Sequence, residues 1–224
     1  MLFASAPLTG SHVVSVVGSG GKTSLLAALA RELPGTVALA TTTHIWPSAG
    51  MPVVTGGTGQ VDAALGECRV VCVGTPAEDG KLTGTPEDAE RLAVLADHVL
   101  VEADGSRQLP LKAHASWEPV VPACSDACVL VVGASGLGQP IEKVVHRAGL
   151  FCSRAGCWED DLASPARVAQ VIASEKADGL LLFDRLLVNQ VRDDRSRQAG
   201  LALVRELRAR GIDIPAELVD LPRP

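Results

Sequence analysis

The chain has 224 residues, a length that fits one α/β domain or a domain with a modest appendage. Its net charge of −6 and its aromatic content of 3%, without tyrosine, weigh against a nucleic-acid-binding protein, which needs basic surfaces and stacking side chains. No apolar run approaches the ~20 residues that span a bilayer, and residues 1–7 lack the basic start and long apolar core of a signal peptide. We therefore expect a cytoplasmic protein with no membrane segment.

A phosphate-binding loop is predicted near the start of the chain. A continuous apolar run at residues 13–17 predicts a buried strand, and residues 25–33 predict a helix. Between them lies the sequence Gly18-Ser19-Gly20-Gly21-Lys22-Thr23-Ser24. Glycines let successive backbone N–H groups point inward, and the helix start adds the positive end of its dipole. We expect Lys22 to reach the outer phosphates of a nucleotide and the Thr23 hydroxyl to bind Mg²⁺. The loop is a variant, because the common G-x-x-x-x-G-K-[ST] pattern would place a glycine where Val16 stands.

Hydroxyl groups follow the second predicted strand, at residues 36–40. Thr41, Thr42, Thr43 and His44 come where open α/β sheets bind ligands, at the carboxyl end of a strand. The threonines are candidates for binding Mg²⁺ or a γ-phosphate, and the alternative is that their hydroxyls cap local backbone. His44 is a candidate phosphate donor, proton carrier or capping residue.

Residues 50–96 are predicted to connect the second strand to the next strand that carries candidate residues. We expect a loop over residues 50–60, a short helix at 61–66 and a strand at 70–73. A hairpin-like excursion over residues 74–86, with turn residues Asp79-Gly80, leads to a helix from Thr85 to about residue 96.

Two carboxylates end the next predicted strand, which begins at residue 99. Glu102 and Asp104 share a strand face by the two-residue period, close to the open end of the sheet. Nucleoside triphosphatases hold Mg²⁺ at such a position, directly or through water. We expect one carboxylate to belong to the metal site and the other to orient water or substrate, with Lys22 and Mg²⁺ as their charge partners.

The second half of the chain carries weaker candidates. Residues 109–122 contain three prolines, which exclude a regular element over most of this segment. Within it, Lys112 and His114 either bind phosphate or acid at the mouth of the cleft, or are a solvated lysine and a packed histidine. His146 and Arg147 follow a helix-like run from residue 141 and form either an anion site or a surface pair.

Later elements are predicted as strands at 127–133, 185–189 and the edge 217–221, and as helices at 164–174 and 196–210. Asn189 begins a segment placed like the guanine-reading N-K-x-D, but Gln190 and Arg192 replace the lysine and the aspartate, so the sequence does not choose between ATP and GTP. The six cysteines have poor spacing for zinc, and we expect reduced, buried or incidental thiols.

Taken in order, several of these motifs resemble the YqeC family. They are the glycine loop, Thr41-Thr42-Thr43-His44, Glu102-Ala103-Asp104-Gly105-Ser106, Leu111-Lys112-Ala113-His114 with Glu118-Pro119-Val120-Val121-Pro122, and Val145-His146-Arg147. The resemblance covers about residues 12 to 193. It implies a P-loop protein that serves as an accessory protein of selenium-dependent molybdenum hydroxylases, and a second site beside the phosphates formed by Lys112, His114, His146 and Arg147.

The resulting prediction is a single three-layer α/β domain over residues 1–224, P-loop NTPase-like, with a mainly parallel sheet. Its expected activity is Mg²⁺-dependent binding and hydrolysis of a nucleoside triphosphate, ATP or GTP, during maturation of a molybdenum hydroxylase or its molybdopterin-type cofactor. The alternatives are a small-molecule kinase or nucleotidyl transferase acting on a phosphorylated cofactor, and a non-enzymatic molybdenum cofactor or metal carrier.

Overall fold

A parallel sheet is the centre of the computed structural model, which describes residues 2–4, 7–46, 51–78 and 80–222. Within these residues eight strands lie in the order β13-β12-β10-β1-β8-β2-β5-β4, and every neighbouring pair is parallel. The strands are β1 (Val13–Gly18), β2 (Val37–Thr41), β4 (Val53–Val54), β5 (Val70–Val73), β8 (His98–Glu102), β10 (Ala127–Gly133), β12 (Arg185–Asn189) and β13 (Ala216–Leu218). The predicted α/β class with a mainly parallel sheet is confirmed.

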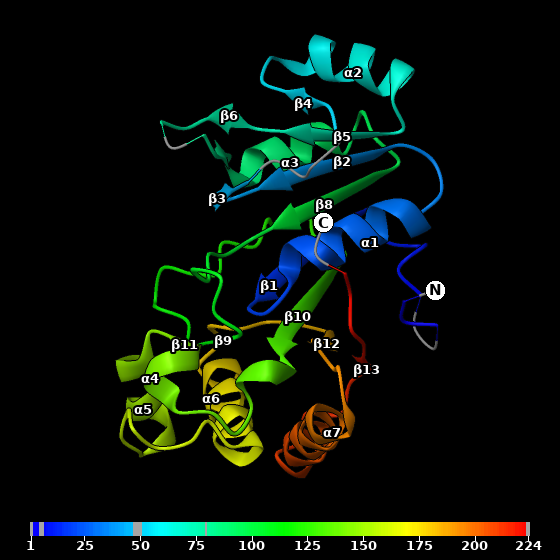
Figure 1. Ribbon diagram of the computed structural model, residues 1–224. Coiled ribbons are helices and arrows are strands. Elements are labelled where there is room, and N and C mark those ends of the chain that lie inside the picture. Colours follow the sequence, from blue (N-terminus) through cyan, green and yellow to red (C-terminus); the bar gives the residue numbers. More distant parts are fainter. Residues whose placement is uncertain (1, 5–6, 47–50, 79, 223–224) are drawn as a thin grey trace.

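Helices cover both faces of this sheet (Figure 1). On one face α1 (Lys22–Glu32) packs through its leucines, together with the N-terminal Phe3 and Leu8. On the other face α2 (Thr58–Glu67) and α3 (Pro86–Leu92) cover the half that contains β2 and β5. The half that contains β10 and β12 is covered by α5 (Ala148–Ala155), α6 (Pro165–Ala177) and α7 (Asp194–Ala209). The result is the predicted three-layer arrangement.

Successive side chains of β10 pack alternately into the cores on the two faces of the sheet. Val129 and Val131 join the core beneath α1, whereas Leu130 and Val132 join the core beneath α6 and α7. A strand that is buried on both faces must be apolar throughout, which explains the continuous apolar runs in the sequence.

Two small sheets lie beside the main one. β3 (His44–Ile45), β6 (Thr75–Pro76) and β7 (Leu82–Thr83) form an antiparallel sheet, which confirms the hairpin expected at residues 74–86. Asp79 of its expected turn lies outside the described residues. β9 (Leu111–Lys112) pairs in parallel with β11 (Val145–His146).

Three local predictions differ from the structure. The expected loop at 50–60 contains β4 and the start of α2. The segment 109–122 is irregular over most of its length, as predicted, and contains the two-residue strand β9. The run from residue 141 is the short helix α4 (Ile141–Val144) followed by β11, and α3 ends at Leu92. The two-residue strands β4, β9 and β11 exist because a distant segment pairs with them, as Val53 does with Cys72, and local sequence carries little of that information.

The strand order places the candidate residues together. β1 lies between β10 and β8, so the loop after Gly18 emerges between the carboxyl ends of two neighbouring strands. Open parallel sheets bind ligands at this edge. Among the described residues, no helix is both long enough and apolar enough to cross a membrane.

Candidate functional site

The glycine loop after β1 is held tightly against the strands around it. Gly18, Gly20 and Gly21 have φ values of 93°, 91° and 132°, a region that side chains disfavour. A Cβ on Gly20 would lie 2.4 Å from Gly133 Cα, and one on Gly21 would lie 2.0 Å from Asn189 Nδ2. The Ser19 N–H donates to Val131 O at 2.8 Å. Glycine is therefore required here both by backbone conformation and by space.

The N-terminus of α1 is open. The helix begins at Lys22, and in the described structure no side chain caps its first turn. The first N–H groups of a helix have no partner within the helix, and they carry the positive end of its dipole. This end of α1 can therefore accept an anion.

Lys22 does not extend into solvent; it is 4% exposed and lies between two carboxylates. Its Nζ is 3.2 Å from Asp104 Oδ1 and 3.6 Å from Glu102 Oε1, and it donates to Gly18 O at 2.8 Å and to Ser106 Oγ at 3.3 Å. Burial opposes the charge on Lys22, but the two carboxylates outweigh burial and raise the pKa of the ammonium group above its usual value. The expectation that both carboxylates share a strand face agrees with these distances.

Asp104 is fully buried below the loop. Its Oδ2 accepts hydrogen bonds from Gly18 N at 2.8 Å and from Lys112 Nζ at 3.0 Å, and it lies 2.9 Å from His114 Nε2. Its Oδ1 makes the ion-pair contact with Lys22 but no well-formed hydrogen bond within the described residues. Burial favours the neutral acid, but Lys22, His114 and Lys112 outweigh it and hold the pKa of Asp104 well below its usual value.

His114 is clamped between two buried carboxylates. Its Nδ1 lies 2.6 Å from Glu175 Oε2 on α6, opposite the contact of its Nε2 with Asp104. Burial opposes a charged ring, but the two carboxylates prevail and raise the pKa of His114 above its usual value. Since an imidazolium donates at both nitrogens, this geometry suits the charged form. Arg154 donates to Glu175 Oε1 at 2.6 Å and completes the charge balance.

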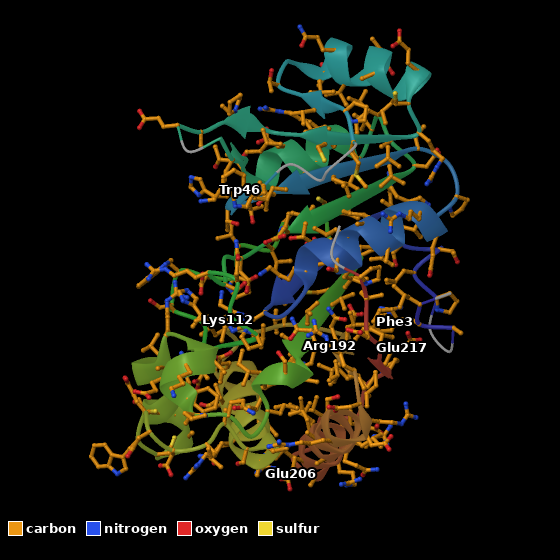
Figure 2. The ribbon with its side chains drawn as sticks, in the orientation of Figure 1. Phe3, Trp46, Lys112, Arg192, Glu206 and Glu217 are labelled. Atoms are coloured by element: carbon orange, nitrogen blue, oxygen red, sulfur yellow. The ribbon has the colours of Figure 1, made fainter. Side chains whose placement is uncertain are left out.

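Lys112 continues the network toward the surface. Its Nζ donates to Gly105 O at 2.6 Å and lies 2.7 Å from Glu118 Oε1. Arg147 also pairs with Glu118, and its guanidinium lies 5.6 Å from the ring centre of the exposed Trp117. Figure 2 labels Lys112 between the strands of the main sheet and the helices α4 to α6. Charges of alternating sign thus run from Lys22 through Asp104, Lys112 and Glu118 to Arg147.

Glu102 faces the start of α1. Its Oε2 accepts a hydrogen bond from Thr23 Oγ1 at 3.3 Å. Burial raises the pKa of Glu102, Lys22 lowers it and Asp104 raises it, so that the net direction is upward. Of the two carboxylates, Glu102 is thus the one that contacts the hydroxyl expected to bind Mg²⁺.

Thr41, at the end of β2, and Thr42, which follows it, bond to backbone in this structure. Thr41 Oγ1 donates to Glu102 O at 2.9 Å and accepts from Thr43 N at 2.9 Å, and Thr42 Oγ1 donates to Val120 O at 2.7 Å. These contacts fix the segment beside Glu102. His44 is exposed on β3, in the small antiparallel sheet.

The sequence singled out two further residues, His146 and Asn189. His146 is half-buried on β11, where burial and the charges of Arg147, Lys112 and Arg107 lower its pKa to about 4. Asn189 is 2% exposed, and its amide donates to Gly20 O at 3.0 Å and accepts from Leu221 N at 2.9 Å. Asn189 therefore supports the loop through both ends of its side chain.

Sequence reasoning did not single out Ser106, Glu118, Arg154 or Glu175 as site residues. For Glu175 a signal exists, because it follows Val168, Val171 and Ile172 at helical spacing on the buried face of α6. An acid on an apolar face must have a buried partner, and here that partner is His114.

All six cysteines are free thiols, and burial raises the pKa of Cys128 to about 12. The described residues contain no cluster of three or more His, Cys, Asp and Glu side chains arranged to hold a metal ion.

Comparisons with known proteins agree with the motifs at this site. A family model described as "YqeC protein" matches residues 14–149, which contain the glycine loop, both carboxylates, Lys112, His114 and Arg147. The chain belongs to the YqeC family. It is also 38% identical over 159 residues to "Uncharacterized protein YqeC" of Escherichia coli (strain K12), a match that covers 66% of this chain and 62% of the relative. The family model thus ends before α6 and Glu175, the residue that completes the His114 clamp.

Proposed function

We propose that this chain binds a nucleoside triphosphate together with Mg²⁺ and hydrolyses it, in the maturation of a molybdenum hydroxylase or its molybdopterin-type cofactor. The observation that carries the proposal is the position of Lys22. It is the first residue of an uncapped helix, it follows a glycine turn, and its ammonium group faces two carboxylates at the edge of a parallel sheet. The molybdenum hydroxylase role comes from the family resemblance and not from the site geometry.

The loop fits a phosphate group. Gly20 and Gly21 leave no room for a side chain on the side that packs against the sheet, and the open end of α1 supplies N–H donors. Lys22 supplies a positive charge at the first residue of the helix. These are the parts by which glycine loops bind phosphate.

The same site fits Mg²⁺. The ion prefers oxygen ligands and is commonly held by one or two carboxylates together with substrate phosphates. Thr23 Oγ1 and Glu102 Oε2, 3.3 Å apart, would hold it, with Asp104 Oδ1 nearby as a second charge. Bound there, Mg²⁺ would neutralise charge that develops on the phosphate oxygens.

Lys22 cannot serve the phosphates and the carboxylates equally at the same time. When Lys22 turns toward phosphate, Asp104 keeps Lys112 and His114 as partners, whereas Glu102 keeps only the Thr23 hydroxyl among its described side-chain contacts. A divalent cation would replace the positive charge of Lys22 as the partner of the Glu102 carboxylate. We therefore expect nucleotide and Mg²⁺ to bind cooperatively.

In the proposed reaction a water oxygen forms a bond to the terminal phosphorus. The bond from that phosphorus to the bridging oxygen breaks, the nucleoside diphosphate leaves with the electron pair, and one proton of the water is released to solvent. Lys22 and the loop N–H groups would stabilise the charge on the phosphate oxygens. The Thr41–Trp46 segment, bonded to Glu102 O, would change conformation with the state of the nucleotide.

Neither alternative function gains a specific observation. A kinase or transferase that used Lys112 and His114 to bind a phosphorylated acceptor would first have to separate them from Asp104, Glu118 and Glu175. A metal carrier would need a set of ligands, and the described residues contain no group of three or more His, Cys, Asp and Glu side chains that could hold a metal ion.

The test is phosphate release from a panel of nucleoside triphosphates, with and without Mg²⁺ and with and without a molybdenum hydroxylase client. We expect Mg²⁺-dependent turnover that Lys22→Ala lowers by at least 100-fold, while Lys143→Ala, at an exposed position of α4, leaves it unchanged. Binding without Mg²⁺-dependent turnover, even with the client present, would reject hydrolysis. Turnover that required an added small acceptor would favour the transferase.

A further inference from the structure

A tight turn beside the glycine loop has an unusual backbone. The Leu109 N–H donates to Ser106 O at 3.0 Å, and the two residues between them, Arg107 and Gln108, have φ values of 48° and 61°. Positive φ at both central positions defines a turn that normally carries glycine, asparagine or aspartate. Here the chain places an arginine and a glutamine in that strained conformation, so surrounding contacts must hold the turn in place.

Those contacts come from the glycine loop itself. Ser106, at one end of the turn, accepts a hydrogen bond from Lys22 Nζ at 3.3 Å. Leu109, at the other end, accepts a hydrogen bond from Ser19 Oγ. Both ends of the turn are thus bonded to the loop that would bind phosphate. Arg107 is the residue directly after Ser106, whose hydroxyl contacts Lys22, so the Cα of Arg107 lies close to the Lys22 site.

The side chain of Arg107 is available. It is exposed, and within the described residues it makes no ion pair and no hydrogen bond. The neighbouring cations differ in this respect, because Lys112 and Arg147 both pair with Glu118. The charge of Arg107 also reaches His146, where it adds to the burial and the charges of Arg147 and Lys112 that lower the pKa of that histidine.

We propose that Arg107 contacts the terminal phosphate of the bound nucleotide and stabilises the charge on that phosphate during its transfer to water. This inference rests on the proposed function. A planar guanidinium binds two phosphate oxygens at once, and an arginine supplied to a terminal phosphate accelerates transfer strongly. Lys22 would then approach the phosphate from the start of α1, and Arg107 would approach it from the turn whose first residue, Ser106, is hydrogen-bonded to Lys22.

The first test is a pair of affinities in the presence of Mg²⁺. The β,γ-imido analogues of ATP and GTP and the corresponding diphosphates are titrated into the wild type, Arg107→Ala, Arg107→Lys and Arg205→Ala, an exposed arginine in the middle of α7. We expect Arg107→Ala to weaken binding of the triphosphate analogue at least tenfold and binding of the diphosphate less than twofold. Arg107→Lys should lose part of this preference, because lysine keeps the charge without the paired donors. Arg205→Ala should bind both ligands as the wild type does.

Phosphate release from the same four proteins gives the second readout. We expect Arg107→Ala to lower the turnover number at least 100-fold, with the melting temperature within 2 °C of the wild type because the side chain is exposed. If Arg107→Ala keeps the wild-type ratio of affinities and the wild-type turnover, the role of Arg107 is overturned while the nucleotide site stands. If the wild type binds without turnover, hydrolysis and the catalytic part of the Arg107 proposal are both overturned, and the affinity ratio then decides only whether Arg107 contacts the terminal phosphate. If the wild type binds neither ligand, both proposals are overturned.

Discussion

Asp104 Oδ2 lies 2.9 Å from His114 Nε2, and the same oxygen accepts a hydrogen bond from the N–H of Gly18. His114 is thereby connected through one carboxylate to the first residue of the glycine loop. Glu175 holds the other ring nitrogen, so the position of the loop depends on α6 as well as on its own sequence.

Removal of the His114 ring should destabilise the protein strongly. His114→Ala leaves Asp104 and Glu175, both within 1% of full burial, without a shared cation. Breaking a buried ion pair on one side costs about 3–5 kcal/mol, and we expect a loss in that range in the free energy of unfolding, measured by urea titration. The matched control His44→Ala, at an exposed histidine, should change it by about 0.5 kcal/mol or less. Equal effects of the two variants would contradict the clamp.

The His114 clamp also predicts a pH dependence of stability. The pKa of His114 is raised in the folded state, so its contribution is complete below the unfolded value of ~6.5 and is lost as the pH rises through the folded pKa. The free energy of unfolding should therefore fall as the pH rises above the unfolded value of ~6.5, with a slope of at most about −1.4 kcal/mol per pH unit from this group. His114→Gln should remove that part of the slope. The same slope in wild type and variant would show that His114 is not held charged.

His146 should act in the opposite direction. Its pKa is lowered to about 4, so the folded state disfavours the proton that the unfolded chain binds below pH ~6.5. Stability should therefore decrease as the pH falls from 6.5 toward 4, and His146→Gln should reduce this decrease. The measurement is the midpoint of urea unfolding across this range, in which no reduction in the variant would argue against the lowered pKa.

A methyl group at Gly21 should disrupt the loop. In Gly21→Ala the new Cβ would lie 2.0 Å from Asn189 Nδ2, at a φ of 132°, so either the loop or Asn189 must move. We expect a loss of at least 2 kcal/mol in stability or a loss of nucleotide binding. Gly66→Ala is the control, since Gly66 lies within α2 and no heavy atom would lie within 4 Å of the added Cβ, and alanine should stabilise the helix by about 0.5–1 kcal/mol. A tolerated Gly21→Ala would contradict the close packing of the loop.

The strand, glycine turn and first helix could be predicted because their signals are local, namely an apolar run, three glycines and a helical pattern in sequence. The meeting of Lys22 with Glu102 and Asp104 was also within reach, because parallel strands end at one edge of a sheet. The role of Asn189 could not be predicted from the sequence, because its contact with Gly20 O joins segments that are 169 residues apart. The clamp on His114 likewise depends on how α6 packs, which no local pattern specifies.

A substitution of Glu102 can test Mg²⁺ binding independently of nucleotide binding. Glu102→Gln keeps a group of the same size beside Thr23 but removes the charge. We expect the Mg²⁺ concentration for half-maximal turnover to rise at least tenfold, while the nucleotide affinity without Mg²⁺ stays within twofold of the wild type. Asp104→Asn should instead lower the stability of the fold, because Asp104 neutralises three buried cationic groups. An unchanged Mg²⁺ requirement in Glu102→Gln would move the ion away from this carboxylate.

The most direct measurement is calorimetric titration of the wild-type protein with a non-hydrolysable nucleoside triphosphate analogue, in the presence and in the absence of Mg²⁺. The central claim is that Lys22 exchanges its carboxylate partners for phosphate while Mg²⁺ takes its place at Glu102. It predicts saturable one-to-one binding that Mg²⁺ strengthens at least tenfold and that Lys22→Ala abolishes. Absence of binding across adenosine and guanosine analogues, or binding that Mg²⁺ and Lys22→Ala leave unchanged, would contradict it.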